Sequence, residues 1–288
     1  MSSSLKTLGR IEDVRASVRE ARQLGHAIGL VPTMGALHDG HVRLIEACRR
    51  EAPFVVVSIF VNPTQFGPAE DYRKYPRTLD ADAERCQAGG ASVIFAPGVE
   101  TMYPNGATST FVEVPGLSTT LEGSSRPGHF RGVATVVLKL LEIVGPDVAY
   151  FGEKDYQQLL VIRRMVHDLT LPVTIRSVPT VREADGLAMS SRNRYLNAEE
   201  HRAATVLSRA LGKAVEAVAA GERSADRVRQ ILRETVESES MARLDYAEVA
   251  DAETLEPLTE LRAGRPGVAL LAAWVGPARL IDNRALPL

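Results

Sequence analysis

Apolar runs and amphipathic stretches alternate through the first part of the chain. The run at residues 54–61 (FVVVSIFV) is almost wholly apolar, as expected of a strand covered on both faces of a parallel sheet. Further strands are predicted at residues 27–31, 92–95, 148–151 and 173–178. Apolar residues at helical spacing predict helices at 11–24, 42–50, 79–88, 133–144 and 156–169. Strands that alternate with helices in this way indicate a doubly wound α/β sheet.

The pattern changes near residue 179. A long helix is predicted at 197–220, and Ser224 is a suitable N-cap for a second helix. Three strand-like runs follow, at 244–249, 268–275 and 279–283. Helices followed by a short meander indicate a smaller α+β domain. We therefore expect two domains, 1–179 and 180–288, with a loop rich in Gly, Pro, Ser and Thr at 98–128.

Composition narrows the possible classes of function. The apolar fraction of 45% and the charged fraction of 24% are typical of a soluble globular protein. A net charge of −2 gives no electrostatic support for binding nucleic acid or a membrane surface. Cys48 and Cys86 lack metal-ligand spacing and are expected to be free, partly buried thiols. Since the sequence also shows no signal-peptide core and no membrane-spanning run, it predicts a cytoplasmic protein.

Polar segments follow four of the predicted strands. In an open α/β sheet, ligands bind beyond the carboxyl ends of the strands, so these segments are expected to converge on one cleft. The segments are PTMGALHDGH (32–41), NPTQFG (62–67), FGEKDYQQ (151–158) and PTVREADGLAMSSRN (179–193).

The first segment, residues 32–41, is called the histidine turn below. It leads from a strand into a helix through Gly35 and Gly40, which permit close backbone approach. Free backbone N–H groups and the helix dipole at such a junction favour phosphate binding. Gly40 is expected immediately before the helix, with His41 in its first turn. Two alternatives stay open: an ordinary turn whose histidines cap the helix or face water, and a zinc site, although no third ligand lies nearby.

The other segments supply further polar groups. In 179–193, two hydroxyls and the guanidinium of Arg192 suit a triphosphate. In 151–158, Lys154 can neutralise a phosphate, and Asp155 can cap a helix or accept a ribose hydroxyl. In 62–67, the amides of Asn62 and Gln65 can hold a hydroxy acid. Each segment, taken alone, also fits a plain surface loop, helix start or turn.

Two further groups of residues lie near these segments. Asp71, Asp80 and Asp82 are expected to be surface and capping acids rather than metal ligands. Residues 128–132 (GHFRG) fit either the rim of the cleft or a glycine-flanked helix entry.

Five motifs together resemble those of the pantothenate synthetase (pantoate–β-alanine ligase) family. PTMGALHDGH, FVNPTQFG, GHFRGVATVV, FGEKDYQQ and DGLAMSSRN have its order and spacing over almost the whole chain. The histidine turn is similar to the His-x-Gly-His element of the nucleotidyltransferase superfamily, which includes class I aminoacyl-tRNA synthetases. Residues 189–192 resemble its Lys-Met-Ser-Lys-Ser element but lack both lysines, which leaves Arg192 and Lys154 to supply positive charge. The implied fold is Rossmann-like.

The resemblance also implies a two-step reaction. The pantoate carboxylate attacks the α-phosphorus of ATP, which gives pantoyl adenylate and pyrophosphate. The amine of β-alanine then attacks the acyl carbon, which gives pantothenate and AMP. Both nucleophiles belong to substrates, so the protein has to position them and neutralise charge. ATP brings its own Mg²⁺, and no metal ligand from the protein is expected.

The family's functional residues map onto this sequence in three groups. The implied catalytic residues are His41, as proton donor, His38, Lys154 and Arg192. The implied ATP-binding residues are Met34, Gly35, Ala36, Leu37, His38, Asp39, Gly40, His41, Gly152, Glu153, Lys154, Asp155, Val181, Met189, Ser190, Ser191 and Arg192. The implied pantoate- and β-alanine-binding residues are Gln65, Gln158, Asn62, Pro32 and Met34, with Phe66 in the apolar part of the pocket.

Other functions remain as alternatives. Another adenylyltransferase of the superfamily shares the histidine turn but does not explain residues 62–67 or 151–158. An RNA-binding synthetase-like core is disfavoured by the net charge of −2. A nucleotide sensor without turnover is disfavoured because both histidines, Lys154 and Arg192 are present. The family further implies a homodimer, in which the C-terminal domain closes over the ATP site.

Overall fold

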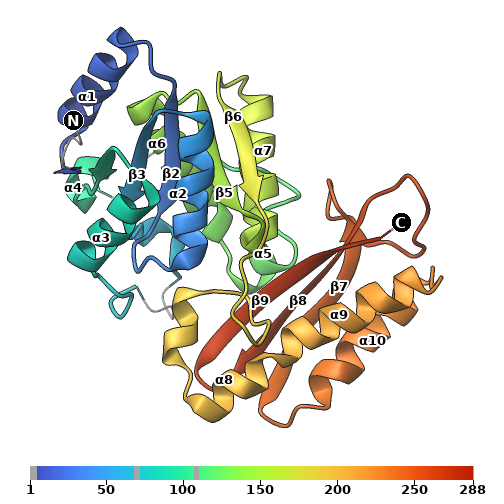
Figure 1. The fold of residues 1–288 in the computed structure, drawn as a ribbon. Helices are drawn as coiled ribbons and strands as arrows, with labels where there is room; N and C mark the ends of the chain where they lie inside the picture. The colour runs from blue at the N-terminus through green and yellow to red at the C-terminus, as the bar shows by residue number, and fades with distance from the viewer. Residues whose placement is uncertain (1–4, 68–71, 107–109, 288) are drawn as a thin grey trace. The chain divides into compact units, whose positions relative to one another are not determined.

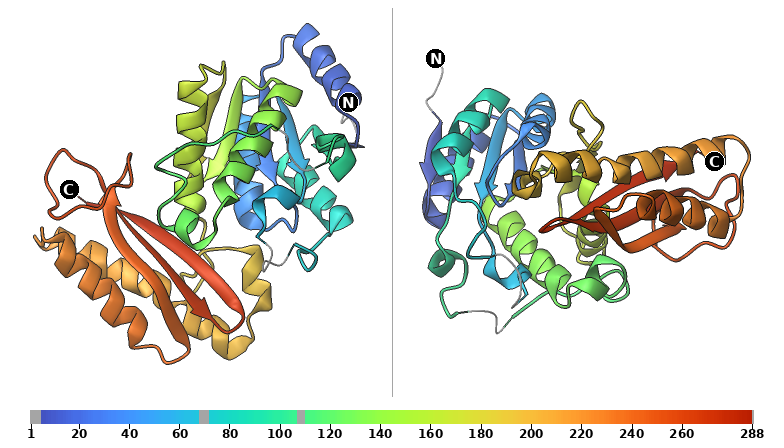
Figure 2. Two further views of the ribbon diagram at one scale, coloured as in Figure 1. Left: turned by 180° about the vertical axis from the view of Figure 1, so that it is seen from behind. Right: turned by 90° about the horizontal axis from the view of Figure 1, so that it is seen from below.

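The chain folds into two compact units, which are described separately (Figures 1 and 2). The computed structural model describes residues 5–67, 72–106 and 110–287. The first unit comprises Met1–Glu153 and Gln157–Pro179, and the second comprises Lys154–Tyr156 and Thr180–Leu288. The predicted Asp71 lies outside the described residues.

The first unit is built on a six-stranded sheet of the order β1-β4-β3-β2-β5-β6, with all strand pairs parallel. The strands are β1 (Lys6–Leu8), β2 (Ile28–Thr33), β3 (Phe54–Ile59), β4 (Val93–Phe95), β5 (Val148–Gly152) and β6 (Thr174–Val178). The predicted doubly wound α/β sheet is confirmed. The strand order reverses between the neighbours β2 and β5, and ligands bind at such a point in open α/β sheets.

Helices cover both faces of this sheet. The long ones are α1 (Ile11–Gln23), α2 (Asp39–Glu51), α3 (Leu79–Gly89), α6 (His129–Val144) and α7 (Tyr156–Asp168). Helices α2 and α3 pack together in front of the sheet in Figure 1, and α6 lies on the opposite face with α1 against it (Figure 2). Cys48 and Cys86 are free and fully buried in the core beneath α2 and α3. Burial raises the pKa of each thiol to about 12, so they behave as core residues.

Three details of the first unit differ from the predicted pattern. Strand β1 was not predicted, because its three residues pair only with β4 at the sheet edge and are largely exposed. Helix α6 begins at His129 instead of residue 133. The predicted loop at 98–128 contains two short helices, α4 (Val99–Met102) and α5 (Glu122–Ser125).

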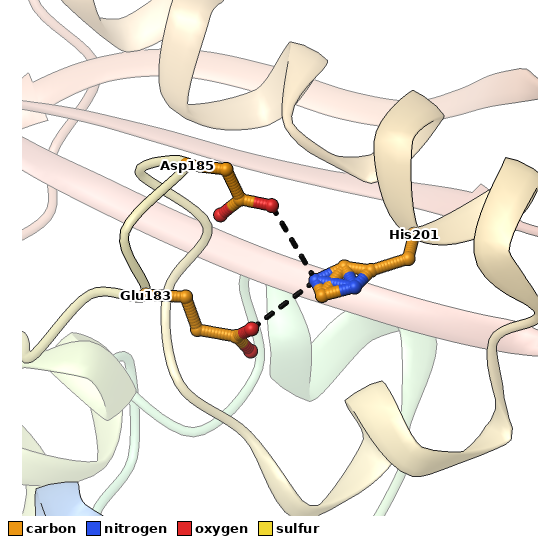
Figure 3. A group of neighbouring side chains, drawn as sticks. All are labelled: Glu183, Asp185 and His201. Atoms are coloured by element: carbon orange, nitrogen blue, oxygen red, sulfur yellow. Dashed lines mark ion pairs between the residues drawn. The ribbon is translucent and has the colours of Figure 1, made fainter.

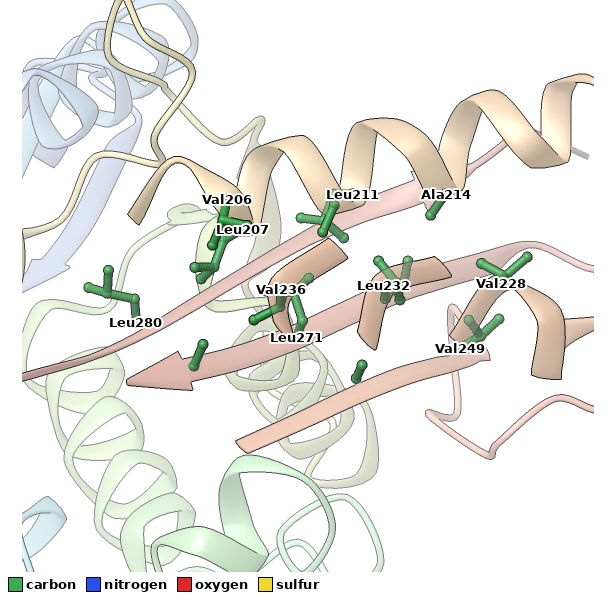
Figure 4. Close-up of a cluster of buried hydrophobic side chains, with 14 of the residues drawn as sticks. Val206, Leu207, Leu211, Ala214, Val228, Leu232, Val236, Val249, Leu271 and Leu280 are labelled. Atoms are coloured by element: carbon green, nitrogen blue, oxygen red, sulfur yellow. The ribbon is translucent and has the colours of Figure 1, made fainter. Parts of the chain in front are cut away.

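The second unit packs two helices on one face of a three-stranded antiparallel sheet (Figure 4). The sheet has the order β7 (Ala242–Asp251), β8 (Gly267–Val275) and β9 (Ala278–Leu286). Helix α9 (Val206–Ala219) faces β9, and α10 (Ala225–Glu237) faces β7. Ser224 caps α10 as predicted, because its side chain accepts from the Arg227 amide. The smaller α+β architecture is thus confirmed.

The single long helix predicted at 197–220 is wrong. The segment forms α8 (Ala198–Ala204) and α9, which are separated at Thr205. The Thr205 hydroxyl donates to the carbonyl of Arg202 at 2.7 Å. Such a side-chain bond competes with the helical ladder, and the apolar periodicity on either side did not reveal it. In the described part of the chain, no helix is both long and apolar enough to cross a membrane.

Asp251 should make the second unit sensitive to acid. Burial alone would raise the pKa of this carboxyl, but hydrogen bonds from Arg265 and from the Glu253 and Thr254 amides lower it to about 2. Its contribution to stability is therefore complete above its ordinary pKa of 3.8 and is lost as the pH falls through about 2. We expect Asp251→Asn to lower the midpoint of denaturant unfolding at neutral pH. The difference in midpoint between variant and parent should shrink as the pH falls from 4 to 2. Fluorescence of Trp274, the chain's single tryptophan and part of β8, reports this unfolding. A difference that stays constant down to pH 2 would refute this account.

Candidate active site

The histidine turn joins β2, at the centre of the sheet, to α2. Two consecutive residues of the turn, Gly35 and Ala36, have left-handed backbones with φ of +85° and +51°. Glycine adopts this conformation readily, whereas alanine does so only where its surroundings enforce it. Gly35, Ala36 and Leu37 are buried, and His38 and His41 are partly exposed. The turn is thus fixed on its inner side and presents its histidines on the outer side.

Backbone amides 35–38 of the turn all donate within the protein. Gly35 N–H donates to Thr33 Oγ1 at 3.2 Å, and His38 N–H donates to Nδ1 of His41 at 3.2 Å. The amides of Ala36 and Leu37 donate to the carboxylate of Asp82, at 3.0 and 2.7 Å. The expectation that free backbone N–H groups line this part of the turn is therefore wrong. An anion at this turn would therefore be bound by side chains and by the first amides of α2, which lie before the helix's own hydrogen bonds begin.

The two imidazoles lie against each other at the start of α2. His38 is the N-cap, and His41 is the third residue of the helix, which begins at Asp39 and so includes Gly40. Their ring centroids are 4.1 Å apart and the rings are inclined by 46°. Since Nδ1 of His41 accepts a hydrogen bond from the backbone, a neutral His41 carries its proton on Nε2. His41 is thereby held in the tautomer that can donate from its outer nitrogen.

The amide side chain of Gln65 meets the histidine-turn residue Met34. Gln65 follows β3 in a short 3-10 helix, η1 (Pro63–Gln65), and its Nε2 lies 2.8 Å from Sδ of Met34. Its Oε1 accepts from Asn62 Nδ2 at 3.2 Å. The structure thus brings two of the sequence-predicted pocket residues, Met34 and Gln65, into contact.

Asn62 holds the segment that carries Gln65. Its side chain is fully buried, and its Nδ2 also donates to the carbonyl of Gly132 at 3.2 Å. Its Oδ1 accepts from the hydroxyls of Thr64 and Tyr103. A Cβ atom on Gly132 would overlap the Thr64 carbonyl, so only glycine lets α6 approach this closely. In this structure Asn62 acts on Gln65, and direct contact with a substrate stays a prediction.

The start of α6 braces the same segment. Nδ1 of His129 lies 2.8 Å from the carbonyl of Gln65, and Arg126 donates to this carbonyl at 3.4 Å. An Arg126 nitrogen is 3.0 Å from Nε2 of His129. The residues GHFRG therefore form a helix entry that fixes the backbone of Gln65.

The residues after β5 are divided between the two units. Gly152 ends β5 in the first unit, and Glu153, which follows it in the same unit, accepts from the Ser177 hydroxyl at 2.8 Å. Gln158 is partly buried in α7 of the same unit. Lys154 and Asp155 belong to the second unit, where the carbonyl of Lys154 accepts from Asn283 Nδ2 at 3.0 Å.

In the second unit, the predicted phosphate ligands follow a small hairpin. Arg182 and Ala188 pair as an antiparallel bridge, and Met189 N–H donates to the Val181 carbonyl at 2.9 Å. The guanidinium of Arg182 binds both oxygens of Asp282 on β9, at 2.7 and 3.0 Å. The Asp282 side chain is 2% exposed, so this ion pair is a buried anchor for the hairpin.

Residues 190–193 continue from this hairpin. The Ser190 hydroxyl accepts from Arg192 N–H at 3.3 Å and so caps a 3-10 turn, η3 (Ser191–Tyr195). The Asn193 amide donates to Glu183 at 2.7 Å and to the Ala188 carbonyl at 3.1 Å. The hairpin and the loop Ser190–Asn193 are therefore tied into one piece.

Figure 3 shows a second brace of this piece, which sequence reasoning missed. Nε2 of His201 on α8 lies 3.2 Å from Glu183 and 3.5 Å from Asp185. These donor atoms all lie within 4.8 Å of one another and are of types that can bind a metal. The other oxygens of Glu183 and Asp185 accept from Asn193 and from the Leu187 amide, so these contacts tie α8 to the hairpin.

The chain was compared with known proteins. The family model for pantoate–β-alanine ligase matches residues 6–285. The chain belongs to this family. It is 54% identical over 282 residues to the pantothenate synthetase of Moorella thermoacetica, a match that covers 98% of this chain and 99% of that protein.

Solved structures of the pantoate–β-alanine ligase family share the fold. The pantothenate synthetase of Thermus thermophilus has 49% identity and a TM-score of 0.91, with 97% of this chain and 99% of that chain covered. A pantoate–β-alanine ligase of Francisella tularensis, in complex with beta-gamma ATP and β-alanine, has 35% identity and a TM-score of 0.79. That match covers 97% of each chain.

Proposed function

We propose that this pantoate–β-alanine ligase works through a pantoyl adenylate intermediate and that the residues described above carry out the reaction. ATP and pantoate react first, which releases pyrophosphate, and β-alanine then displaces AMP to give pantothenate. The observation that carries the proposal is the pair of imidazoles at the start of α2, where the sheet order reverses. The Francisella relative, solved with a nucleotide and β-alanine, supports ATP and β-alanine as ligands.

His38 and His41 act on the phosphates. When pantoate attacks the α-phosphorus, negative charge grows on the leaving pyrophosphate, and donors fixed in advance stabilise it. His41 donates from Nε2, because its Nδ1 is occupied by the His38 amide. The amides of Gly35, Ala36 and Leu37 are engaged by the protein, so these residues serve ATP by shaping the turn. Asp39 and Gly40 place the first amides of α2 near the anion.

ATP takes further ligands from the segments after β5 and β6. Lys154 and Arg192 supply positive charge, Ser190 and Ser191 bind phosphate oxygens, and Met189 contacts ATP through its apolar side chain. Gly152, Glu153, Asp155 and the backbone of Val181 hold the adenosine. Mg²⁺ is carried by the phosphates of ATP. Asp82 is not a ligand of this ion, because both of its carboxylate oxygens accept from backbone amides.

Pantoate lies beside Met34 and Gln65. Gln65 and Gln158 bind its polar groups, and Asn62 acts near both pantoate and β-alanine. Pro32, Met34 and Phe66 line the apolar part of the pocket.

Closure of the C-terminal domain (180–288) over the ATP site excludes water from the adenylate. Small-angle scattering should show compaction with ATP and pantoate, and its absence would count against closure.

Two product measurements test the reaction. Pyrophosphate release should require pantoate as well as ATP, and AMP release should further require β-alanine. Pyrophosphate that appears without pantoate, or never appears, would refute the proposal and favour another adenylyltransferase activity.

We further propose a cytoplasmic homodimer. Sedimentation equilibrium tests the dimer.

Replacing Gln65 should weaken pantoate binding selectively. We expect Gln65→Ala to raise KM for pantoate about tenfold or more, since a hydrogen bond to a charged group contributes roughly 1.5–3 kcal/mol. KM for ATP should change less than about twofold, because the proposed phosphate and adenosine ligands are other residues, which Gln65→Ala leaves in place. The control Gln87→Ala removes an exposed amide on α3 and should leave both constants unchanged. Equal losses for both substrates would remove Gln65 from the pantoate pocket.

A further inference from the structure

Asp82 is a carboxylate buried behind the histidine turn. It lies in the first turn of α3, is 2% exposed and was expected to be a surface or capping acid. Its Oδ1 accepts from Leu37 N–H at 2.7 Å, and its Oδ2 accepts from Ala36 N–H at 3.0 Å. The Thr78 hydroxyl donates to Oδ2 at 3.3 Å. Asp82 therefore fills the concave side of the turn with hydrogen bonds from three donors.

The backbone of the turn is shaped to receive this carboxylate. The left-handed residues Gly35 and Ala36 turn two successive N–H groups, those of Ala36 and Leu37, toward the same anion. A Cβ atom on Gly35 would lie only 3.0 Å from Oδ2 of Asp82, so glycine is needed for the approach. The left-handed conformation of Ala36 is unfavourable by itself, and it persists where surrounding bonds enforce it. Asp82 supplies two of those bonds.

The peptide that Asp82 holds leads directly into the imidazole pair. Leu37 precedes His38, and the next amide, His38 N–H, donates to Nδ1 of His41. A change in the orientation of the Leu37 peptide would therefore move both His38, which is the N-cap, and the backbone amide that donates to Nδ1 of His41. Reacting groups have to be held within a fraction of an ångström for full activity.

We infer that Asp82 is a positioning residue for the adenylation step, acting through the turn on His38 and His41. This inference rests on the proposed role of the histidines. Asp82 touches no reacting atom in this account. It fixes the backbone so that His41 donates in the right direction while the transition state forms.

The test compares Asp82→Asn with Asp80→Asn. Asn keeps one acceptor oxygen but turns an NH₂ group toward a backbone N–H, whereas Asp80 is an exposed acid on the same helix turn. We expect Asp82→Asn to lower kcat for pantoate-dependent pyrophosphate release about 10- to 100-fold with little change in either KM. Amide formation from supplied pantoyl adenylate and β-alanine should fall less than threefold. Asp80→Asn should match the parent in both half-reactions.

A merely structural role would behave differently. Loss of folded protein lowers both half-reactions by the same factor, and such a result would overturn the inference. The decisive measurement repeats Asp82→Asn in the His41→Ala background. If Asp82 acts through His41, the second substitution lowers adenylation less than threefold further. A full 10- to 100-fold further loss would refute positioning, and a normal His41→Ala enzyme would instead refute the histidine role.

Thr78→Val keeps the inference testable if Asp82→Asn does not fold. This change removes only the hydroxyl that donates to Oδ2 and leaves the carboxylate in place. We expect adenylation to fall about two- to fivefold while amide formation from pantoyl adenylate is unchanged. Unchanged adenylation, or an equal loss in both half-reactions, would overturn the inference.

Discussion

Replacing His41 with alanine should slow pyrophosphate release from ATP and pantoate by about 10²- to 10⁴-fold, the range typical of a lost proton donor or anion-stabilising group. His41 stands in the first turn of α2, and its Nδ1 already accepts from the backbone. In the proposed role His41 donates to the substrate from Nε2, so alanine removes that donor completely. The effect should fall on kcat, because the charge on the leaving pyrophosphate develops in the transition state.

The fold should survive this change. The His41 side chain is partly exposed, and its loss leaves the His38 amide near solvent, at a cost of about 1 kcal/mol. The control His167→Ala removes an imidazole that is 86% exposed at the far end of α7 and should leave turnover unchanged. Turnover of His41→Ala within about threefold of the parent would take His41 out of its assigned role.

The parallel sheet could be predicted from the sequence because four of its strands, β2 to β5, are buried on both faces. These four strands are short apolar runs between helical patterns, and β1 escaped because three edge residues carry too little pattern. At the break between α8 and α9 the Thr205 hydroxyl bonds the Arg202 carbonyl, and such a bond leaves no trace in hydrophobic periodicity. Hydrophobic patterns in a sequence predict burial well, but they predict local side-chain hydrogen bonds poorly.

The site shows the same division between pattern and geometry. Spacing located the histidine turn, but only coordinates show that amides 35–38 are already engaged. A signal for Asp82 was nevertheless present. Asp82, Cys86 and Gly89 are spaced by four and three residues, which places them on one helix face, and all three are buried. An acid on the apolar face of a helix needs internal partners, and the turn provides them.

Removing Asp282 should cost the second unit about 3–5 kcal/mol, the usual penalty for breaking one side of a buried ion pair. The Arg182 side chain is 18% exposed and binds both Asp282 oxygens, so Asp282→Ala leaves a mostly buried guanidinium without its carboxylate partner. Asp282 also accepts from the Asn283 amide, which the variant leaves without this partner. Denaturant unfolding followed by Trp274 fluorescence measures the change within this unit.

The matched control is Glu260→Ala, which breaks an exposed pair with Arg262 in the same unit. Side chains that are 54% and 74% exposed are screened by water, so its loss should stay below about 1 kcal/mol. Because the Arg182 hairpin leads into Ser190–Arg192, Asp282→Ala should also raise KM for ATP where the protein is still folded. A stability loss no larger than that of Glu260→Ala would show that the hairpin is held by its other contacts, chiefly Asn193 and the bridge to Ala188.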